Sequence, residues 1–246
     1  MNIYIKWYEK LVIGLFSLFL VIIAIWISVV PLTKSKAFYL YEFKKNDTVE
    51  VTGYSMEELE VIAVKIIDYL FNKTDDMQVE INDEIVFSNQ ALIHMSDVRD
   101  LYNDGRTLAF SILFFTIAMG LFIWYNFSRL KKYLFKYTVV IYSLIGLLII
   151  VIGIFAIIDF DLVFDIFHRI IFPNEQKYND AFFGSVSNYE EIPGVDNLML
   201  IKILSIGLFM DVGIIVGSFA IVVIISWSIV CFIFKKKHNK KEVQNV

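Results

Sequence analysis

Four long runs of apolar residues dominate the chain. They cover residues 11–31, 107–127, 137–158 and 212–234, and none of them contains Asp, Glu, Lys, Arg or His. Each run has about the 20 residues that a helix needs to cross the hydrocarbon core of a bilayer. The pattern therefore predicts a mainly α protein, built as a four-helix transmembrane bundle.

The first run raises the question of a secretory signal, because the small-residue sequence "SKA" follows at 35–37. The run is longer than the apolar region of a typical signal peptide, and it ends at Pro31, before that sequence. We therefore interpret it as an uncleaved anchor. The spans also lack the intramembrane charges that mark ion and proton pathways, which argues against a channel or a pump.

Basic residues predict the orientation. Lys6 and Lys10 precede the first span, "SRLKKYLFKY" connects spans two and three, and five lysines follow span four, in "KKKHNKKEV". Positive segments stay on the cytoplasmic side, so both termini are expected there. Residues 32–106, with 15 Asp and Glu against 8 Lys and Arg, and residues 159–211 are then extracytoplasmic. We interpret residues 1–246 as a single integral membrane domain in the cell membrane.

Local patterns in residues 32–106 predict a small folded cap between spans one and two. Ser55 and Glu58, in "SMEE", fit a capping box that starts a helix at about 56–71. The sequence "MQVEINDEIVF" alternates around an Asn–Asp pair and predicts a short hairpin. Ser88 is expected to cap a helix at about 89–102, and Gly105 to break it before span two.

A second outer segment follows span three and begins "IDFDLVFDIFHRIIFPNE". Helical spacing aligns Asp161, Asp165 and His168, and Pro173 is expected to stop this helix. Asp165, one turn before His168, is expected to accept from the imidazole and fix its tautomer. The apolar stretch 197–210, "NLMLIKILSIGLFM", is predicted to lie in the membrane interface or to dip into it before span four.

Two of the three histidines fall in the predicted outer segments, and each has an acid within one helical turn. His94 is followed by Asp97, and His168 is preceded by Asp165. They are either solvated or interfacial residues near helix ends, or an acid–base pair. A zinc site would need a carboxylate such as Asp97 as third ligand. Without HExxH spacing or a cysteine cluster, we predict no metal.

Other chemistries have less support in the sequence. There is no GxSxG-type elbow to present a nucleophilic serine. There is no phosphate-binding or dinucleotide motif, so no cofactor is expected, and no nucleic-acid partner either. The histidine pair therefore remains the chemically informative feature.

Taken in order, the motifs resemble those of the lipoprotein intramolecular transacylase (Lit) family of bacterial membrane proteins. They are "TGYSMEEL" with "DYL" in 52–70, "HMSDVRDL" at 94–101 and "FHRIIFP" at 167–173, and the resemblance spans roughly residues 10–235. The chain departs from the family at 174–196, "NEQKYNDAFFGSVSNYEEIPGVD", which is longer and lacks a tryptophan. Ile171 also stands where phenylalanine is common.

The resemblance implies that the sn-2 acyl chain of a diacylglyceryl-cysteine moves to the α-amino group of the same N-terminal cysteine, giving a lyso-form lipoprotein. Diacylated bacterial lipoproteins would be the substrate, within membrane lipid. His94 and His168 would be catalytic. We expect His94 to act as general base with support from Asp97, and His168 as acid or oxyanion stabiliser. The reverse assignment and a covalent acyl-imidazole are alternatives.

Three further residues of these motifs, Met95, Arg99 and Phe167, are expected to support the site or bind substrate, although a solvated surface role is open for Arg99. Two other functions also remain open. One is a lipid esterase that uses the same histidines with water. The other is a non-enzymatic sensor or assembly protein with a ligand-binding cap. The sequence does not decide the oligomeric state.

Overall fold

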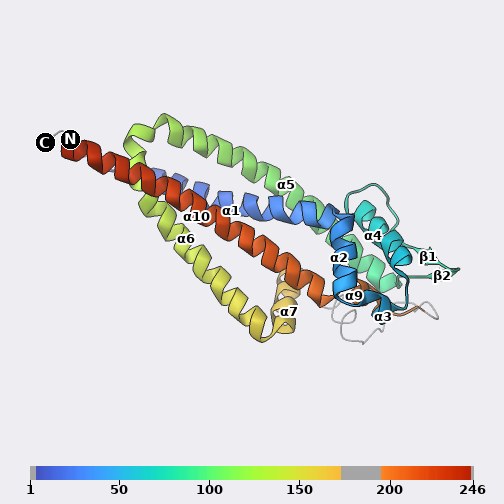
Figure 1. Cartoon of the computed structure of the whole chain (residues 1–246). Coiled ribbons are helices and arrows are strands. Elements are labelled where there is room, and N and C mark those ends of the chain that lie inside the picture. Colours follow the sequence, from blue (N-terminus) through green and yellow to red (C-terminus); the bar gives the residue numbers. More distant parts are fainter. Residues whose placement is uncertain (1–3, 173–194, 245–246) are drawn as a thin grey trace. The chain divides into compact units, whose positions relative to one another are not determined.

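The structure is a computed structural model of the chain and describes residues 4–172 and 195–244, with side chains up to residue 237 (Figure 1). Its residues form two compact units, which are described separately. We call residues 1–29, 107–157 and 214–246 the bundle unit, and residues 30–106 and 158–213 the cap unit. Several long helices contribute residues to both.

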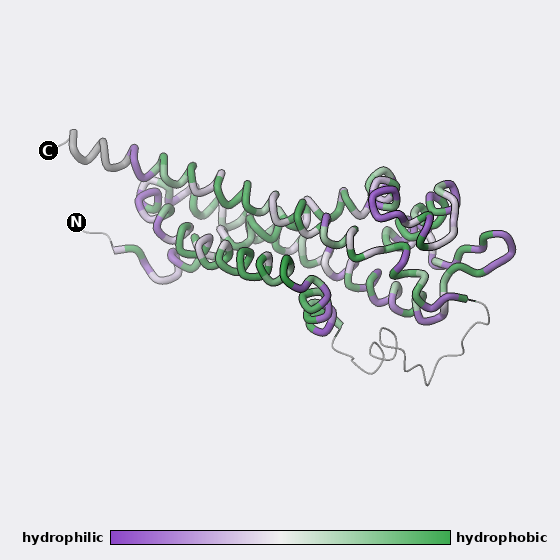
Figure 2. The backbone as a smooth tube through the Cα atoms, turned by 60° about the horizontal axis from the view of Figure 1, so that its bottom comes forward, coloured by the Kyte–Doolittle hydropathy of each residue, from purple (hydrophilic) through white to green (hydrophobic). Residues whose placement is uncertain are grey.

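Four helices are long and apolar enough to cross a membrane, which confirms the predicted mainly α class with four spans. They are α1 (Trp7–Lys34), α5 (Asn89–Tyr125), α6 (Phe127–Ile158) and α10 (Ile206–Gln244). Figure 2 shows hydrophobic residues along most of their length, and hydrophilic residues more often in the shorter elements. In the bundle unit, large apolar side chains such as Ile157 and Leu121 remain exposed, as expected of helices that face lipid.

The bundle unit is held together by contacts among all four helices. Its largest buried cluster joins side chains of α1, α5, α6 and α10: Ile13, Ile123, Leu130, Leu134 and Cys231. Between α1 and α6, the hydroxyl groups of Ser17 and Thr138 lie 3.0 Å apart in a buried hydrogen bond. Small polar side chains of this kind let helices approach closely and bond across an apolar interface.

A buried ion pair joins α1 to the start of α6. Glu9 is fully buried, and its carboxylate pairs with the guanidinium of Arg129. The other carboxylate oxygen accepts from the backbone N–H of Lys6 at 2.9 Å. Arg129 also donates to Asn126 at 3.1 Å, so the charged groups have partners on both sides.

The cap unit contains most of the short elements. They are α2 (Lys36–Lys45), α3 (Thr48–Thr52), α4 (Met56–Leu70), β1 (Glu80–Ile81), β2 (Glu84–Ile85), α7 (Phe160–Ile171) and α9 (Met199–Ile203). Its core is formed around the apolar face of α4, where Leu59, Ile62 and Ile66 are fully buried. Phe43 from α2 and Phe87 before α5 complete the same cluster.

Several local predictions are confirmed. Ser55 and Glu58 form a reciprocal capping box at the start of α4. Strands β1 and β2 pair antiparallel, and Asn82 and Asp83 between them have φ of 54° and 65°. Two residues of positive φ form the tight turn that such a hairpin needs. Ser88 accepts from the backbone N–H of Ala91 at 3.3 Å and caps α5.

One prediction about helix extent is wrong. Gly105 does not break the chain, because α5 continues from Asn89 to Tyr125. A glycine inside a helix costs only about 1 kcal/mol relative to alanine, which a long continuous helix tolerates. In the stretch 197–210, Leu200, Ile203 and Leu208 are buried in the cap core, and its place at the membrane interface stays a prediction. Pro173 lies outside the described residues.

Replacing Arg129 by Met should lower the free energy of unfolding by about 3–5 kcal/mol, because the buried Glu9 carboxylate loses its cation. The measurement is the unfolding transition of the purified protein in detergent. Lys132→Met, on an exposed lysine of the same helix, is the matched control. Adding Glu9→Gln should recover part of the loss, and equal transitions for the two single variants would contradict this role.

Candidate functional site

The two histidines predicted from separate motifs lie beside each other in the cap unit. His94 is in the second turn of α5, and His168 is in the last turn of α7, whose N-terminus is capped by Asp159. Their ring centroids are 6.1 Å apart and the rings are inclined by 26°, so the imidazoles stack. Since α5 and α7 are far apart in sequence, only the fold brings these rings together.

Phenylalanine rings surround the histidine pair. Phe172 lies 5.5 Å from the His94 ring and 5.8 Å from the His168 ring, measured between centroids. Phe164 is closer, 4.0 Å from His168, and its ring also neighbours Phe209 of α10 at 5.1 Å and Phe160 at 5.9 Å. The imidazoles therefore have an apolar environment.

Phe164, Phe172 and Phe209 were not predicted from the sequence as site residues. Phe164 and Phe172 lie four residues before and after His168, so helical spacing contains a signal for both. Phe209 has no such signal, because it comes from a helix 41 residues further along the chain. Only the tertiary structure brings Phe209 beside the site.

One contact that orients His168 lies within its own helix. Its Nδ1 lies 2.9 Å from the carbonyl oxygen of Phe164. A carbonyl can only accept, so Nδ1 carries a proton and Nε2 is the nitrogen available to a substrate. Asp165, predicted to orient this ring, pairs instead with Arg169, with Nε and Oδ2 3.0 Å apart.

The other proposed site residues have distinct surroundings. Met95 is buried in the cap core, 2% exposed, whereas Phe167 is half exposed and its ring lies 5.7 Å from His168. Arg99 points to another part of the cap unit. Its guanidinium lies 4.3 Å from the ring centre of Tyr69 and 3.6 Å from the Asp75 carboxylate.

Burial shifts both histidines toward the neutral form. Both lie outside the apolar runs, since His94 precedes residue 107 on α5 and α7 follows span three. Desolvation lowers the pKa of His94 to about 4, with a further lowering by the nearby His168 and an opposing effect of Asp97. Desolvation also lowers the pKa of His168, against the opposing effects of the Phe164 carbonyl and of Asp165. Both rings are thus available as proton acceptors at neutral pH.

Among residues 4–172 and 195–237, no three side chains of the types His, Cys, Asp and Glu gather as a set that could hold a metal ion. The four apolar spans indicate an integral membrane protein. The paired imidazoles among aromatic rings are suited to acid–base chemistry on an apolar substrate.

The family model described as "Lipoprotein intramolecular transacylase Lit" matches residues 12–178, which include both histidines. The match covers more than half of the chain, so the chain belongs to this family. It is an acyltransferase of the membrane, and the family name identifies its substrates as lipoproteins. No curated protein matches the chain in sequence.

Solved structures share the fold. The Bacillus cereus lipoprotein intramolecular transacylase Lit superposes with a TM-score of 0.66 at 16% identity, over 96% of this chain and 98% of that one. A variant of that protein with a histidine replaced by arginine gives 0.63, also at 16% identity, over 97% and 95%. A histidine-to-alanine variant gives 0.62 at 16% identity, over 96% of each chain.

The His94 ring should stay neutral at pH 6 and titrate near pH 4, which imidazole NMR of the protein in detergent can follow. Histidine-to-glutamine variants assign the three ring signals. In His168→Gln the pKa of His94 should rise, because a neighbouring positive charge is removed. A titration of His94 near 6.5 in the wild type would contradict the apolar environment.

The lowered pKa of His94 also makes the stability of the fold depend on pH. The unfolded chain binds a proton at His94 below about pH 6.5, whereas the folded chain does so only near pH 4. The stability that neutral His94 contributes is therefore complete above about 6.5 and is lost as the pH falls toward 4. In the pH range 6.5 to 4, His94→Gln should lose less stability than the wild type.

Proposed function

We propose that this chain moves the sn-2 acyl group of a diacylglyceryl-cysteine to the α-amino group of the same cysteine, with His94 and His168 as catalytic residues. The observation that carries the proposal is the stacked pair of largely neutral imidazoles, 6.1 Å apart, in a chain of the transacylase family. The product is an N-acyl, monoacylglyceryl lipoprotein.

The reaction balances without water or a cofactor. The amine nitrogen forms a bond to the ester carbonyl carbon, and the bond from that carbon to the sn-2 glyceryl oxygen breaks. One proton moves from the nitrogen to the glyceryl oxygen. Nucleophile and ester belong to one molecule, so holding them in line replaces the encounter of two reactants and can contribute about 7–11 kcal/mol to the barrier reduction.

His94 is the better candidate for the general base. An α-amino group has a pKa of about 8, so an imidazole with a pKa of about 4 hardly deprotonates a resting ammonium. It is suited to the next stage, because nitrogen that has attacked a carbonyl becomes strongly acidic. We therefore assign to His94 the removal of the proton from the attacking amine, after the amine has bound in its neutral form.

His168 is the better candidate for the acid and oxyanion stabiliser. The Phe164 carbonyl and the nearby Asp165 both favour its charged form, and Nδ1 already donates to that carbonyl. The proton on Nε2 of the charged ring can then stabilise the oxyanion and pass to the leaving glyceryl oxygen. His94 then passes the proton it accepted to Nε2 of His168, so the pair ends the cycle unchanged.

Membrane location suits this substrate. We propose that the acyl chains remain in lipid while the ester reaches the histidines, next to exposed apolar side chains of α7 such as Phe167 and Ile170. We propose that Arg99 and Met95 stabilise the cap unit around the site, because both side chains contact other residues of that unit. We also propose that the cap unit faces the extracytoplasmic side and that both termini are cytoplasmic.

Replacing His94 or His168 by Ala should lower the transfer rate at least about 100-fold, the lower range for a positioned acid or base. The measurement is mass spectrometry of a lipoprotein's N-terminal lipopeptide from a host that lacks N-acylation and expresses this chain. The wild type should give a lipopeptide of unchanged mass with an N-acyl fragment, because the reaction is an isomerisation.

The matched control is His238→Ala, in the lysine-rich tail, which should retain transfer. Folding of each variant is checked by its unfolding transition in detergent. Free fatty acid and a lipopeptide reduced by one acyl group would indicate an esterase instead. Full transfer by either active-site variant would remove that histidine from the proposal.

The orientation can be tested with single cysteines in a Cys231→Ser background. A membrane-impermeant maleimide added to intact cells should label Glu57→Cys, on an exposed position of α4, because α4 belongs to the cap unit. Lys132→Cys, between spans two and three, should be labelled only after the membrane is opened. The reverse pattern would invert the proposed topology.

A further inference from the structure

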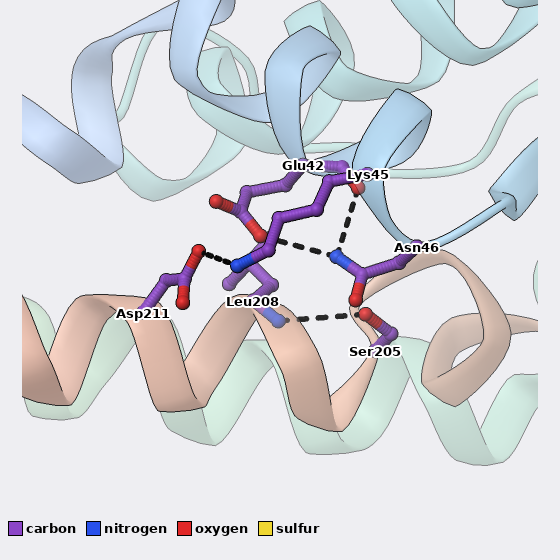
Figure 3. Close-up of polar contacts among 6 residues, drawn as sticks. All are labelled: Glu42, Lys45, Asn46, Ser205, Leu208 and Asp211. Carbon is purple, nitrogen blue, oxygen red and sulfur yellow. Dashed lines mark hydrogen bonds and ion pairs between the residues drawn. The ribbon is translucent and has the colours of Figure 1, made fainter.

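A group of polar side chains fastens α2 to the first turns of α10 within the cap unit (Figure 3). Lys45 forms an ion pair with Asp211 that spans 166 positions of the chain. Glu42, one turn before Lys45, is 1% exposed although it carries a carboxyl group. We call Glu42, Lys45 and Asp211, together with Asn46, the α2–α10 clamp.

The side chain of Asn46, at the end of α2, lies against the first turn of α10. Asn46 donates through Nδ2 to the carbonyl oxygen of Glu42 at 2.8 Å and to its carboxylate at 3.1 Å. Its Oδ1 faces Gly207, where an added Cβ would lie only 1.9 Å away. A side chain at position 207 would therefore force the Asn46 side chain to move and would disturb its hydrogen bonds to Glu42.

The first turns of α10 also carry a residue that contacts a neighbour of His168. Phe209 lies two positions after Gly207 and two before Asp211. Two helical positions correspond to a rotation of about 200°, so Phe209 points away from the clamp. Its ring contacts Phe164 at 5.1 Å, and Phe164 contacts His168 both through its ring, at 4.0 Å, and through its carbonyl oxygen, at 2.9 Å.

We propose that the α2–α10 clamp positions His168 for acyl transfer, by holding Phe209 of α10 against Phe164, which orients the imidazole. Its effect on rate rests on the proposed function, whereas its effect on the His168 ring does not. Glu42, Lys45 and Asp211 are positioning residues, because they act on His168 only through the two phenylalanines.

The stability of the clamp depends on whether the Glu42 carboxyl group carries a proton. Lys45 lowers the pKa of Asp211, chiefly through their hydrogen bond, so that aspartate is charged. Burial and then Asp211 raise the pKa of Glu42, and Asn46 and Lys45 oppose the rise only in part. Of the other nearby groups, Tyr41 acts on Lys45 alone. In the form with Glu42 protonated, which the raised pKa favours, one carboxylate faces one ammonium.

Deprotonation of Glu42 would place two carboxylates beside a single lysine and weaken the contact. The raised pKa of Glu42 sets the direction in which stability changes with pH. The stability contributed by protonated Glu42 is complete below the ordinary glutamate value of about 4.3, and is lost as the pH rises through the raised value. Glu42→Gln keeps a neutral group of the same shape at every pH.

The decisive experiment measures transfer of a synthetic diacylated lipopeptide by the full-length protein in detergent. Asp211→Asn and Lys45→Met should lower kcat about 10- to 100-fold with little change in KM, because the imidazole is misplaced while the substrate still binds. The matched controls are Lys36→Met and Glu60→Gln, which remove another ion pair of α2, 2.5 Å long and exposed, without a link to His168. They should retain the wild-type kcat.

Two further variants separate positioning from folding. The exchange Lys45→Asp with Asp211→Lys restores opposite charges and should recover most of the kcat. The ratio of the Glu42→Gln rate to the wild-type rate should rise with pH, because only the wild type loses its proton at this position. A double exchange that remains as slow as Asp211→Asn, or a constant rate ratio, would overturn the proposal.

Imidazole NMR gives a readout independent of activity. In Asp211→Asn the pKa of His168 should move back toward 6.5 and its Nδ1 proton should exchange faster, while His94→Gln serves to assign the signal. An unchanged His168 signal, with transfer intact in the wild type, would overturn the positioning role. A shifted signal, with no N-acylation by the wild type, would support positioning and refute the proposed function.

Discussion

Hydrocarbon offers no hydrogen-bond partners, and this constraint shapes most of the chain. Backbone N–H and C=O groups inside a bilayer must bond within the same segment, so the four apolar runs become long continuous helices. Irregular structure is displaced to the segments between them. In the described residues the hairpin, the short helices and the turns of positive φ all fall in the cap unit. Chemistry that needs shaped, partly polar surroundings therefore belongs to residues 30–106 and 158–213.

The histidine pair depends on a compromise between polarity and burial. Imidazoles exposed to water would titrate near 6.5 and be charged for part of the time at neutral pH. Aromatic rings around His94 and His168 favour the neutral form instead, while the Phe164 carbonyl retains one oriented hydrogen bond. The two rings then differ in surroundings: His94 has burial as its dominant influence, and His168 has local groups that favour its charge. That difference supports one base and one acid from two copies of the same side chain.

Polar groups elsewhere in the molecule serve to hold helices rather than to react. Glu9 with Arg129, and Lys45 with Asp211, each join elements far apart in sequence. Such pairs contribute little net stability compared with apolar contacts. Glu9 is fully buried, so loss of Arg129 would leave a charge buried alone, whereas the more exposed Lys45–Asp211 pair favours one arrangement of its helices without that penalty. In the cap unit this specificity coincides with the contact of Phe209 and Phe164, so the arrangement of α10 and the orientation of His168 are linked.

The sequence by itself determined the helical class, the four spans, the capping box at Ser55 and the hairpin at Asn82–Asp83, because these depend on local periodicity and side chains within a few residues. It also identified both histidines, through short motifs. It misplaced the break at Gly105, since a glycine's preference is small beside the cooperativity of a long helix. The stacking of His94 on His168, the approach of Phe209, and the clamp between α2 and α10 were decided only by tertiary structure. Each joins residues separated by tens of positions or more, and no local pattern encodes which distant side chain will fill a given space.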